Sequence, residues 1–266
     1  HTQKLGSTLK EIATEKAGII KSHSVTTSPR HQVIVVSAPQ EKEVKKVISK
    51  KCKEAKAKLY EVNRDIFYES RAFDFDIIGV FHEYPCLKIR LLGKHQLINV
   101  AVAVGAIEAL RFYDTYIDID SVRQGLYNTI WPGRCEVVST EPVIILDGAQ
   151  NVASSKVLVE TLKGRFRYRK LYLILGVSED KDIKGVCRKL RELADEVFLT
   201  RADNPRAAEP QALAGYFEHK KVHITNNVKE AQRLARLTAK KEDLILVTGS
   251  LFVVGEARKL ILGKDN

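Results

Sequence analysis

The residues best suited to chemistry are a cation and a carboxylate that stand close together in the sequence. Arg134 ends the run Trp-Pro-Gly-Arg, and Asp147 follows the branched apolar run 143–146. Such a run predicts a strand buried on both faces, so Asp147 falls at a carboxyl strand end, where open α/β sheets bind ligands. A guanidinium there can hold a phosphate through paired hydrogen bonds. The plainer alternatives are a surface salt bridge for Arg134 and a helix cap for Asp147.

Asn99 and Lys16 are polar residues in apolar surroundings. Asn99 lies inside an Ala-rich helix predicted over 96–112, where a buried amide without a partner costs about 1–3 kcal/mol. Lys16 stands at the apolar end of a helix that Ser7 or Thr8 can cap. Burial would favour its neutral, easily modified amine, and extension into solvent is the alternative.

The second half of the chain alternates apolar runs with helical patterns. The predicted strands are 143–146, 171–175, 196–200, 221–224 and 244–248, and the predicted helices lie near 152–163, 182–193, 208–217, 227–239 and 251–262. This alternation predicts a mainly parallel sheet wrapped by helices. The loops 178–182 and 248–250 would then line the same edge as Asp147.

The first half predicts helices mixed with shorter strands. We expect a strand at 32–36, a Lys-rich helix at 41–58, antiparallel strands between 71 and 92 that turn at Glu83-Tyr84-Pro85, and a helix at 120–127. Pro132-Gly133 is the expected joint, which gives domains at 1–133 and 134–266.

Composition bounds the function class. The 266 residues are 44% hydrophobic and 29% charged, and no apolar run approaches the ~18 residues of a membrane span. No leader segment stands at the start, so we expect a cytoplasmic protein. The four cysteines are widely spaced, which predicts free thiols, and the net charge of +11 favours anionic partners.

Several common motifs are missing from the sequence. It contains neither a Gly-x-x-x-x-Gly-Lys-Ser/Thr phosphate loop nor a Gly-x-Gly-x-x-Gly fingerprint, and it lacks Gly-x-Ser-x-Gly. Hydrolase and dehydrogenase functions therefore lose their usual support. The chain also opens on His1 and has no Met, which indicates either a fragment or methionines dropped from the sequence.

Motifs along the whole chain resemble the folylpolyglutamate synthases and dihydrofolate synthases of the Mur ligase superfamily. They are 1–8 with 12–21, 93–96 with Asn99, 131–134, 147–151, 180–182 and 248–252. The resemblance implies an α/β chain in which the C-terminal half of a central ATPase domain precedes a Rossmann-like C-terminal domain. It also implies an ATP-dependent ligase that activates folate or dihydropteroate as an acyl phosphate, which the amine of L-glutamate attacks. A monomer is expected, with no nucleic-acid or membrane partner.

The same resemblance assigns roles to residues of this chain. His1 resembles a magnesium-binding His, and Lys16 resembles a Lys whose carbamylated form helps to hold Mg²⁺. Asn99, Arg134 and Asp147 match positions that contact ATP, while Gln150 and Ser250 match positions that bind glutamate. Most members carry His where this chain has Gln150, which can donate a hydrogen bond but cannot carry charge.

The family's phosphate loop would lie upstream of His1, so we expect these 266 residues alone to be inactive. Two alternatives stay open. One is another Mur-type amino-acid ligation. The other is a non-catalytic module that binds nucleic acid through the Lys-rich helix 41–58, although acidic residues dilute that charge and no aromatics interleave with it.

Overall fold

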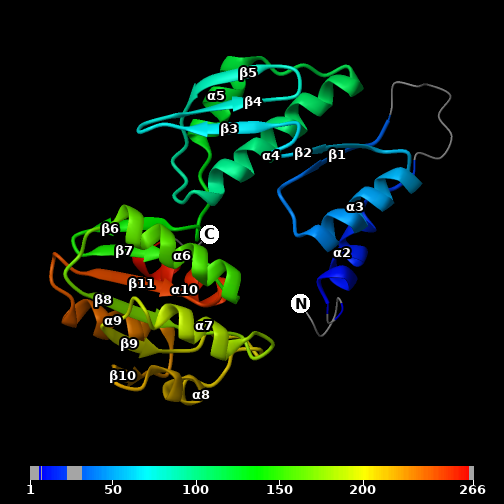
Figure 1. Ribbon diagram of the computed structural model, residues 1–266. Helices are drawn as coiled ribbons and strands as arrows, with labels where there is room; N and C mark the ends of the chain where they lie inside the picture. Colours follow the sequence, from blue (N-terminus) through cyan, green and yellow to red (C-terminus); the bar gives the residue numbers. More distant parts are fainter. Residues whose placement is uncertain (1–5, 7, 23–31, 264–266) are drawn as a thin grey trace. The chain divides into compact units, whose positions relative to one another are not determined.

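The computed structural model describes residue 6 and residues 8–22 and 32–263, which fall into two compact units (Figure 1). Unit 1 comprises the chain up to Arg90 together with Lys94–Thr129, and unit 2 comprises Leu91–Gly93 and the chain from Ile130. Gly133 lies inside unit 2, where its carbonyl accepts the Gly148 N–H at 2.8 Å. The domain bounds 1–133 and 134–266 stay a prediction.

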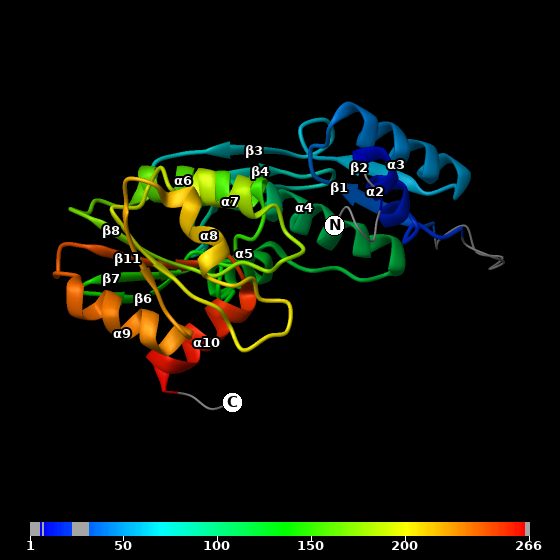
Figure 2. The same cartoon turned by 90° about the horizontal axis from the view of Figure 1, so that it is seen from below.

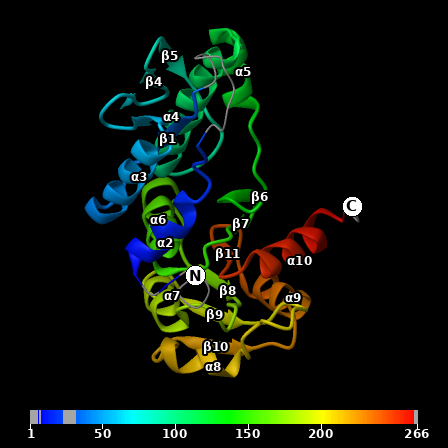
Figure 3. The same ribbon diagram turned by 90° about the vertical axis from the view of Figure 1, so that its right-hand side faces the viewer.

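Unit 2 is built on one six-stranded sheet with the order β10-β9-β8-β11-β7-β6 (Figure 3). All neighbours pair in parallel except β6, which runs antiparallel to β7 at the edge. Five of these strands were predicted and are confirmed, whereas β6 was not predicted. The strands are β6 (Glu136–Thr140), β7 (Val143–Leu146), β8 (Leu171–Leu175), β9 (Glu196–Leu199), β10 (Lys221–Ile224) and β11 (Leu244–Thr248).

Helices cover both faces of this sheet (Figure 2). One face carries α6 (Val152–Arg165), α7 (Ile183–Leu190) and the short α8 (Gln211–Ala214), which continues as the 3₁₀ turn Gly215–Phe217. The other face carries α9 (Val228–Thr238) and α10 (Leu251–Leu262). The predicted helices are thus confirmed, although the helix expected over 208–217 is shorter than its pattern indicated.

The central strands supply both cores of unit 2. In β8, Leu171, Leu173 and Leu175 join the core under α6 and α7, while Tyr172 and Ile174 join the core under α9 and α10. A fully buried side chain of this size contributes roughly 1.5–3 kcal/mol. Successive side chains of this buried strand therefore point alternately to the two helix layers.

The first helix among the described residues of unit 1 is α2 (Leu9–Ala17). Thr8 caps it as expected and forms a capping box with Glu11. Two parallel strands follow, β1 (Ile34–Ser37) and β2 (Lys58–Glu61), connected by α3 (Lys42–Glu54). The helix expected to reach Lys58 ends earlier. Lys56 takes a left-handed backbone conformation (φ +53°) that terminates the helix, and Lys58 then pairs with Ile34.

A three-stranded antiparallel sheet follows in unit 1, formed by β3 (Phe67–Ser70), β4 (Phe75–Ile78) and β5 (Glu83–Leu87). The turn expected at Glu83-Tyr84-Pro85 is wrong, because these residues lie inside β5. The chain turns instead between Gly79 and His82. The buried Glu108 carboxylate accepts the N–H groups of Val80 and His82 at 2.7 and 2.9 Å and so stabilises this turn.

Helix α4 (His95–Ala109) continues as the 3₁₀ turn Leu110–Tyr113, and α5 (Ile119–Asn128) follows. Among the described residues, only the run His95–Tyr113 is long and apolar enough to cross a membrane by length and composition. The core helix of a soluble protein meets the same criterion, and Val100, Ala101 and Val104 of this run lie in the core of unit 1.

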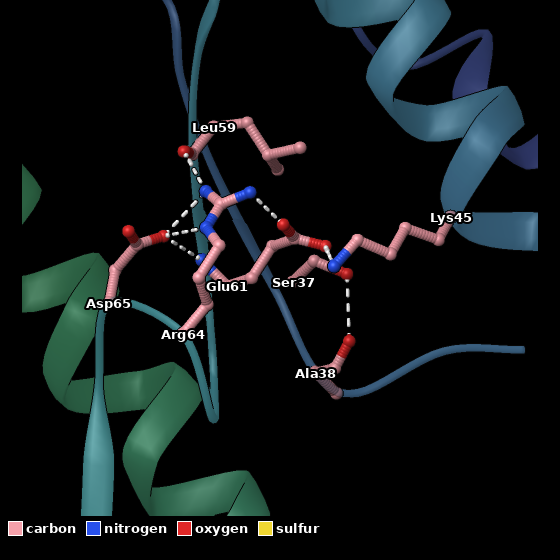
Figure 4. Close-up of polar contacts among 7 residues, drawn as sticks. All are labelled: Ser37, Ala38, Lys45, Leu59, Glu61, Arg64 and Asp65. Atoms are coloured by element: carbon pink, nitrogen blue, oxygen red, sulfur yellow. Dashed lines mark hydrogen bonds and ion pairs between the residues drawn. The ribbon is translucent and has the colours of Figure 1, made fainter. Parts of the chain in front are cut away.

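A polar cluster ties α3 to the carboxyl end of β2 (Figure 4). The buried Glu61 pairs with Lys45 of α3 at 3.1 Å and with Arg64, whose Nη2 donates to the carbonyl of Leu59 at 2.9 Å. The Asp65 carboxylate accepts the backbone N–H of Glu61 at 2.8 Å. Because these charged groups pair with one another, we infer that the cluster stabilises unit 1.

The thiols give a first test of the packing. All four cysteines are unpaired as expected, and only Cys86 is exposed. Burial, reinforced by nearby carboxylates, raises the pKa of Cys135 and of Cys187 to about 12 and also raises that of Cys52. Because the thiolate is the reactive form, an aromatic disulfide reagent at about pH 8 should label Cys86 fast and the others only after unfolding. Fast native labelling of Cys135, mapped by mass spectrometry, would contradict this packing.

The edge of the sheet between β9 and β10 gives a second test. Glu196 is nearly buried, which raises its pKa, but hydrogen bonds from Lys221 (2.9 Å) and His223 (2.6 Å) outweigh burial and leave the pKa below its ordinary value. A depressed carboxyl pKa stabilises the fold above the ordinary value, and the gain is lost as pH falls through the folded pKa. Glu196→Gln should therefore cost about 1 kcal/mol at about pH 5.5, and less at about pH 3. Equal losses of Tm at both pH values would contradict the ion pair.

Candidate functional site

The carboxyl ends of the parallel strands in unit 2 bring together loops that are far apart in the sequence. The N–H of Gly249, after β11, donates to the carbonyl of Ala149, after β7, at 3.0 Å. The N–H of Gly176, after β8, donates to the carbonyl of Thr248 at 3.3 Å. The expectation that 147–151 and 248–250 line one edge is therefore confirmed.

Asp147 connects this edge to the Trp-Pro-Gly-Arg run. Its Oδ1 accepts the N–H of Ala149 at 2.8 Å, and its Oδ2 accepts the N–H of Cys135 at 2.8 Å. Asp147 is thus not the cap of the following helix, because Asn151 caps α6 and forms a capping box with Ser154. The carboxylate is half-buried and fixes the residue directly after Arg134.

Arg134 lies beside the same loop. A Cβ placed on Gly148 would meet Nη1 of Arg134 at 2.7 Å, so the absence of a side chain at 148 makes room for the guanidinium. The guanidinium carbon lies 5.9 Å from the centroid of the Trp131 ring. Within the described part of the chain, Arg134 forms no ion pair, so the salt-bridge alternative is not supported there. The half-buried guanidinium of Arg134 is therefore suited to bind an anion from outside the chain.

Gln150 and Ser250 follow adjacent backbone segments of this edge. Ser250 is buried, and its hydroxyl caps α10 by accepting the N–H of Phe252 at 3.2 Å. It also lines a small pocket with the loops after β8 and β9. Gln150 is half-buried, and its backbone N–H donates to Oγ of Ser154 at 3.2 Å. This hydrogen bond does not use the side-chain amide of Gln150.

The loop after β9 was missed by the sequence reasoning. Asn204 and Ala207 line the same pocket as Ser250, and the guanidinium carbon of Arg206 lies 5.6 Å from the centroid of the Phe252 ring. The sequence could have indicated this loop, because turn-forming residues follow the predicted strand 196–200. Parallel strands end at one edge, so the loop belongs beside Ser250. In the loop after β8, Lys181 pairs with Asp180 at 2.6 Å and lowers the pKa of that carboxyl.

The other predicted site residues belong to unit 1. Asn99 is exposed, not buried as expected, because the buried stripe of α4 runs through Gln96, Val100 and Val104; its amide donates to Oε1 of Gln96 at 2.9 Å. Lys16 is exposed in the last turn of α2, which agrees with the solvent-extended alternative. Their roles in binding stay predictions.

The predicted magnesium ligands are not brought together by the described residues. His1 lies outside them, and within residues 6, 8–22 and 32–263 no group of three or more His, Cys, Asp or Glu side chains is arranged to hold a metal ion. The described residues alone therefore do not make up a magnesium site, and the metal stays a prediction.

Comparison with known proteins shows what this chain is similar to. Residues 133–251 match the Mur ligase, glutamate ligase domain. The dihydrofolate synthase/folylpolyglutamate synthase of Bacillus subtilis is 28% identical over 265 residues, which is 97% of this chain and 60% of that protein.

Solved structures give the same result. Folylpolyglutamate synthase of Mycobacterium tuberculosis, complexed with ADP, superposes with a TM-score of 0.88 at 28% identity over 98% of this chain and 60% of that one. The bifunctional enzyme of Yersinia pestis, complexed with AMPPNP and a Mn ion, gives a TM-score of 0.81 at 25% identity over 99% and 59%. The chain thus spans about 60% of the length of these relatives. Residues 133–251 thus match the Mur ligase, glutamate ligase domain, and the chain as a whole is similar to part of the folylpolyglutamate and dihydrofolate synthases.

Proposed function

We propose that the protein containing this chain is an ATP-dependent ligase that joins L-glutamate to folate or dihydropteroate. The observation that carries the proposal is the half-buried Arg134, which meets no carboxylate among the described residues and lies at the carboxyl edge of a Mur ligase domain. Relatives that bind ADP or AMPPNP support ATP as the phosphate donor. The names of the relatives support folates as acceptors.

The proposed reaction has two steps. A carboxylate oxygen of the folate attacks the γ-phosphorus of ATP, ADP leaves, and an acyl phosphate forms. The neutral amine of glutamate then attacks the acyl carbon, inorganic phosphate leaves, and the nitrogen loses its proton to give the amide. Arg134 would hold phosphate oxygens, and Asn99 and Asp147 would contact the nucleotide.

Gln150 and Ser250 would bind the incoming glutamate. A Gln amide and a Ser hydroxyl can each donate a hydrogen bond to a carboxylate. Because Gln150 carries no charge, another amino acid remains the second candidate, and a panel of amino acids in the assay separates the two. Lys16, once carbamylated, would help to hold Mg²⁺ with His1, and the Mn ion bound by the Yersinia relative supports a divalent cation.

Turnover by the full-length protein is the direct test. We expect ADP release that requires glutamate, a divalent cation and either dihydropteroate or a reduced folate, with the ligated product identified by mass spectrometry. Lys16→Ala should abolish turnover, whereas Lys46→Ala, an exposed lysine of α3, should not. Residues 1–266 alone should be inactive, since no phosphate-loop motif occurs among them. Glutamate-independent ADP release would refute the ligase assignment.

Nucleotide affinity tests Arg134 separately. A hydrogen bond to a charged group contributes about 1.5–3 kcal/mol, so Arg134→Ala should raise the Kd for ADP by roughly ten- to a hundredfold in calorimetry. Arg236→Ala removes an exposed arginine of α9 and serves as the matched control. Equal ADP affinity in both variants would exclude Arg134 from the nucleotide site.

A further inference from the structure

We propose that Glu136 and Arg258 are positioning residues that hold Arg134 in place for the nucleotide. The inference rests on the proposed function, because it assigns these two residues to the same phosphate-binding arginine. Neither residue belongs to the motifs that predict ATP or glutamate binding. Both lie in unit 2, Glu136 at the start of β6 and Arg258 on α10.

The contacts form a chain from α10 to the arginine loop. Nε of Arg258 donates to both carboxylate oxygens of Glu136, at 3.0 and 3.1 Å. Oε2 of Glu136 in turn accepts the backbone N–H of Gly133 at 2.9 Å. The Glu136 side chain is 16% exposed and that of Arg258 is 34% exposed, so water screens this pair only partly. One carboxylate thus bridges a helix and the residue directly before Arg134.

The loop needs this anchor because its backbone is strained. Gly133 has φ +70° and Cys135 has φ +46°, so residues on both sides of Arg134 take the left-handed conformation. For a residue with a side chain this conformation costs on the order of 1 kcal/mol or more unless the surroundings hold it. A Cβ on Gly133 would also lie 2.9 Å from Cγ1 of Val254, so no other residue fits there without movement.

The remaining anchors come from the other side of the loop. The carbonyl of Gly133 accepts the Gly148 N–H at 2.8 Å, and the N–H of Cys135 donates to Asp147 at 2.8 Å. Asp147 is itself predicted to contact ATP, so its substitution cannot separate positioning from binding. Glu136 and Arg258 can be changed without touching any predicted ligand contact, which makes them the informative pair.

The chemistry predicts a graded effect of substitution. Glu136→Ala leaves the Gly133 N–H and the Arg258 guanidinium without their acceptor. Glu136→Gln keeps an acceptor oxygen for Gly133 but loses the charge that orients Arg258. Arg258→Gln leaves Glu136 in place but frees its carboxylate to rotate. Arg134 should therefore be disturbed most by Glu136→Ala and less by the other two variants.

The test is ADP affinity of the full-length protein. Glu136→Ala should raise the Kd for ADP roughly tenfold, as loss of a supporting contact commonly does, while Glu136→Gln and Arg258→Gln should raise it less. Combining Glu136→Ala with Arg134→Ala should give no further loss beyond Arg134→Ala alone, because residues that act through one another are not additive. Glu196→Gln removes another nearly buried, ion-paired carboxylate of the same sheet. It should lower Tm without changing the Kd.

A second measurement reads the positioning without nucleotide. Hydrogen exchange at the amide of Cys135 should accelerate in Glu136→Ala and in Arg258→Gln but not in Glu196→Gln. Unchanged exchange, unchanged ADP affinity in Glu136→Ala, or additive losses in the double variant would each overturn the positioning role. If exchange accelerates while Arg134→Ala binds ADP normally, the nucleotide role of Arg134 has failed. In that case Glu136 and Arg258 only stabilise the loop, and the proposal that they position Arg134 for the nucleotide is overturned.

Discussion

The parallel pairing of β11 with both β7 and β8 is the constraint on which the site depends. Leu246 of β11 stands opposite Ile145 of β7 and Leu173 of β8. All three side chains enter the core under α6 and α7. A slip of β11 by one residue would move its side chains to the opposite core, so packing on both faces fixes the register. The register in turn brings the ends of these strands, and the loops that follow them, to one edge.

Much of unit 2 could be predicted because its signals are local. The run 143–146 is apolar throughout, and the strand that it predicts ends where Asp147 begins. Asn151 and Ser250 are good N-cap residues in front of helical patterns, and both cap helices in the structure. One further rule predicted that the loops 147–151 and 248–250 lie side by side: neighbouring parallel strands have their carboxyl ends at the same edge of the sheet.

The features that were missed depend on partners distant in the sequence. The turn between Gly79 and His82 is held by Glu108, and β6 is an edge strand whose pattern of partial exposure gives no clear apolar alternation. Asn99 was expected to be buried because its helix is apolar. Which stripe of such a helix faces the core depends on the strands that it meets, β1 and β3, and β3 was not predicted. Glu136 and Arg258 likewise come together only when α10 packs back on the sheet.

The distribution of ion pairs in unit 2 leaves Arg134 without a carboxylate partner among the described residues. Arg258 pairs with Glu136 and Arg169 with Asp243, so these guanidinium groups are neutralised inside unit 2. Asp147, which contacts the Arg134 loop, accepts backbone N–H groups with both of its carboxylate oxygens. Among the described residues Arg134 therefore meets no carboxylate within ion-pair distance. A phosphate that binds there, as proposed, would not need to break an internal salt bridge. Breaking such a bridge would cost much of the binding free energy. The fold thus uses Glu136 and Asp147 to shape the loop, an arrangement that agrees with the phosphate contact proposed for Arg134.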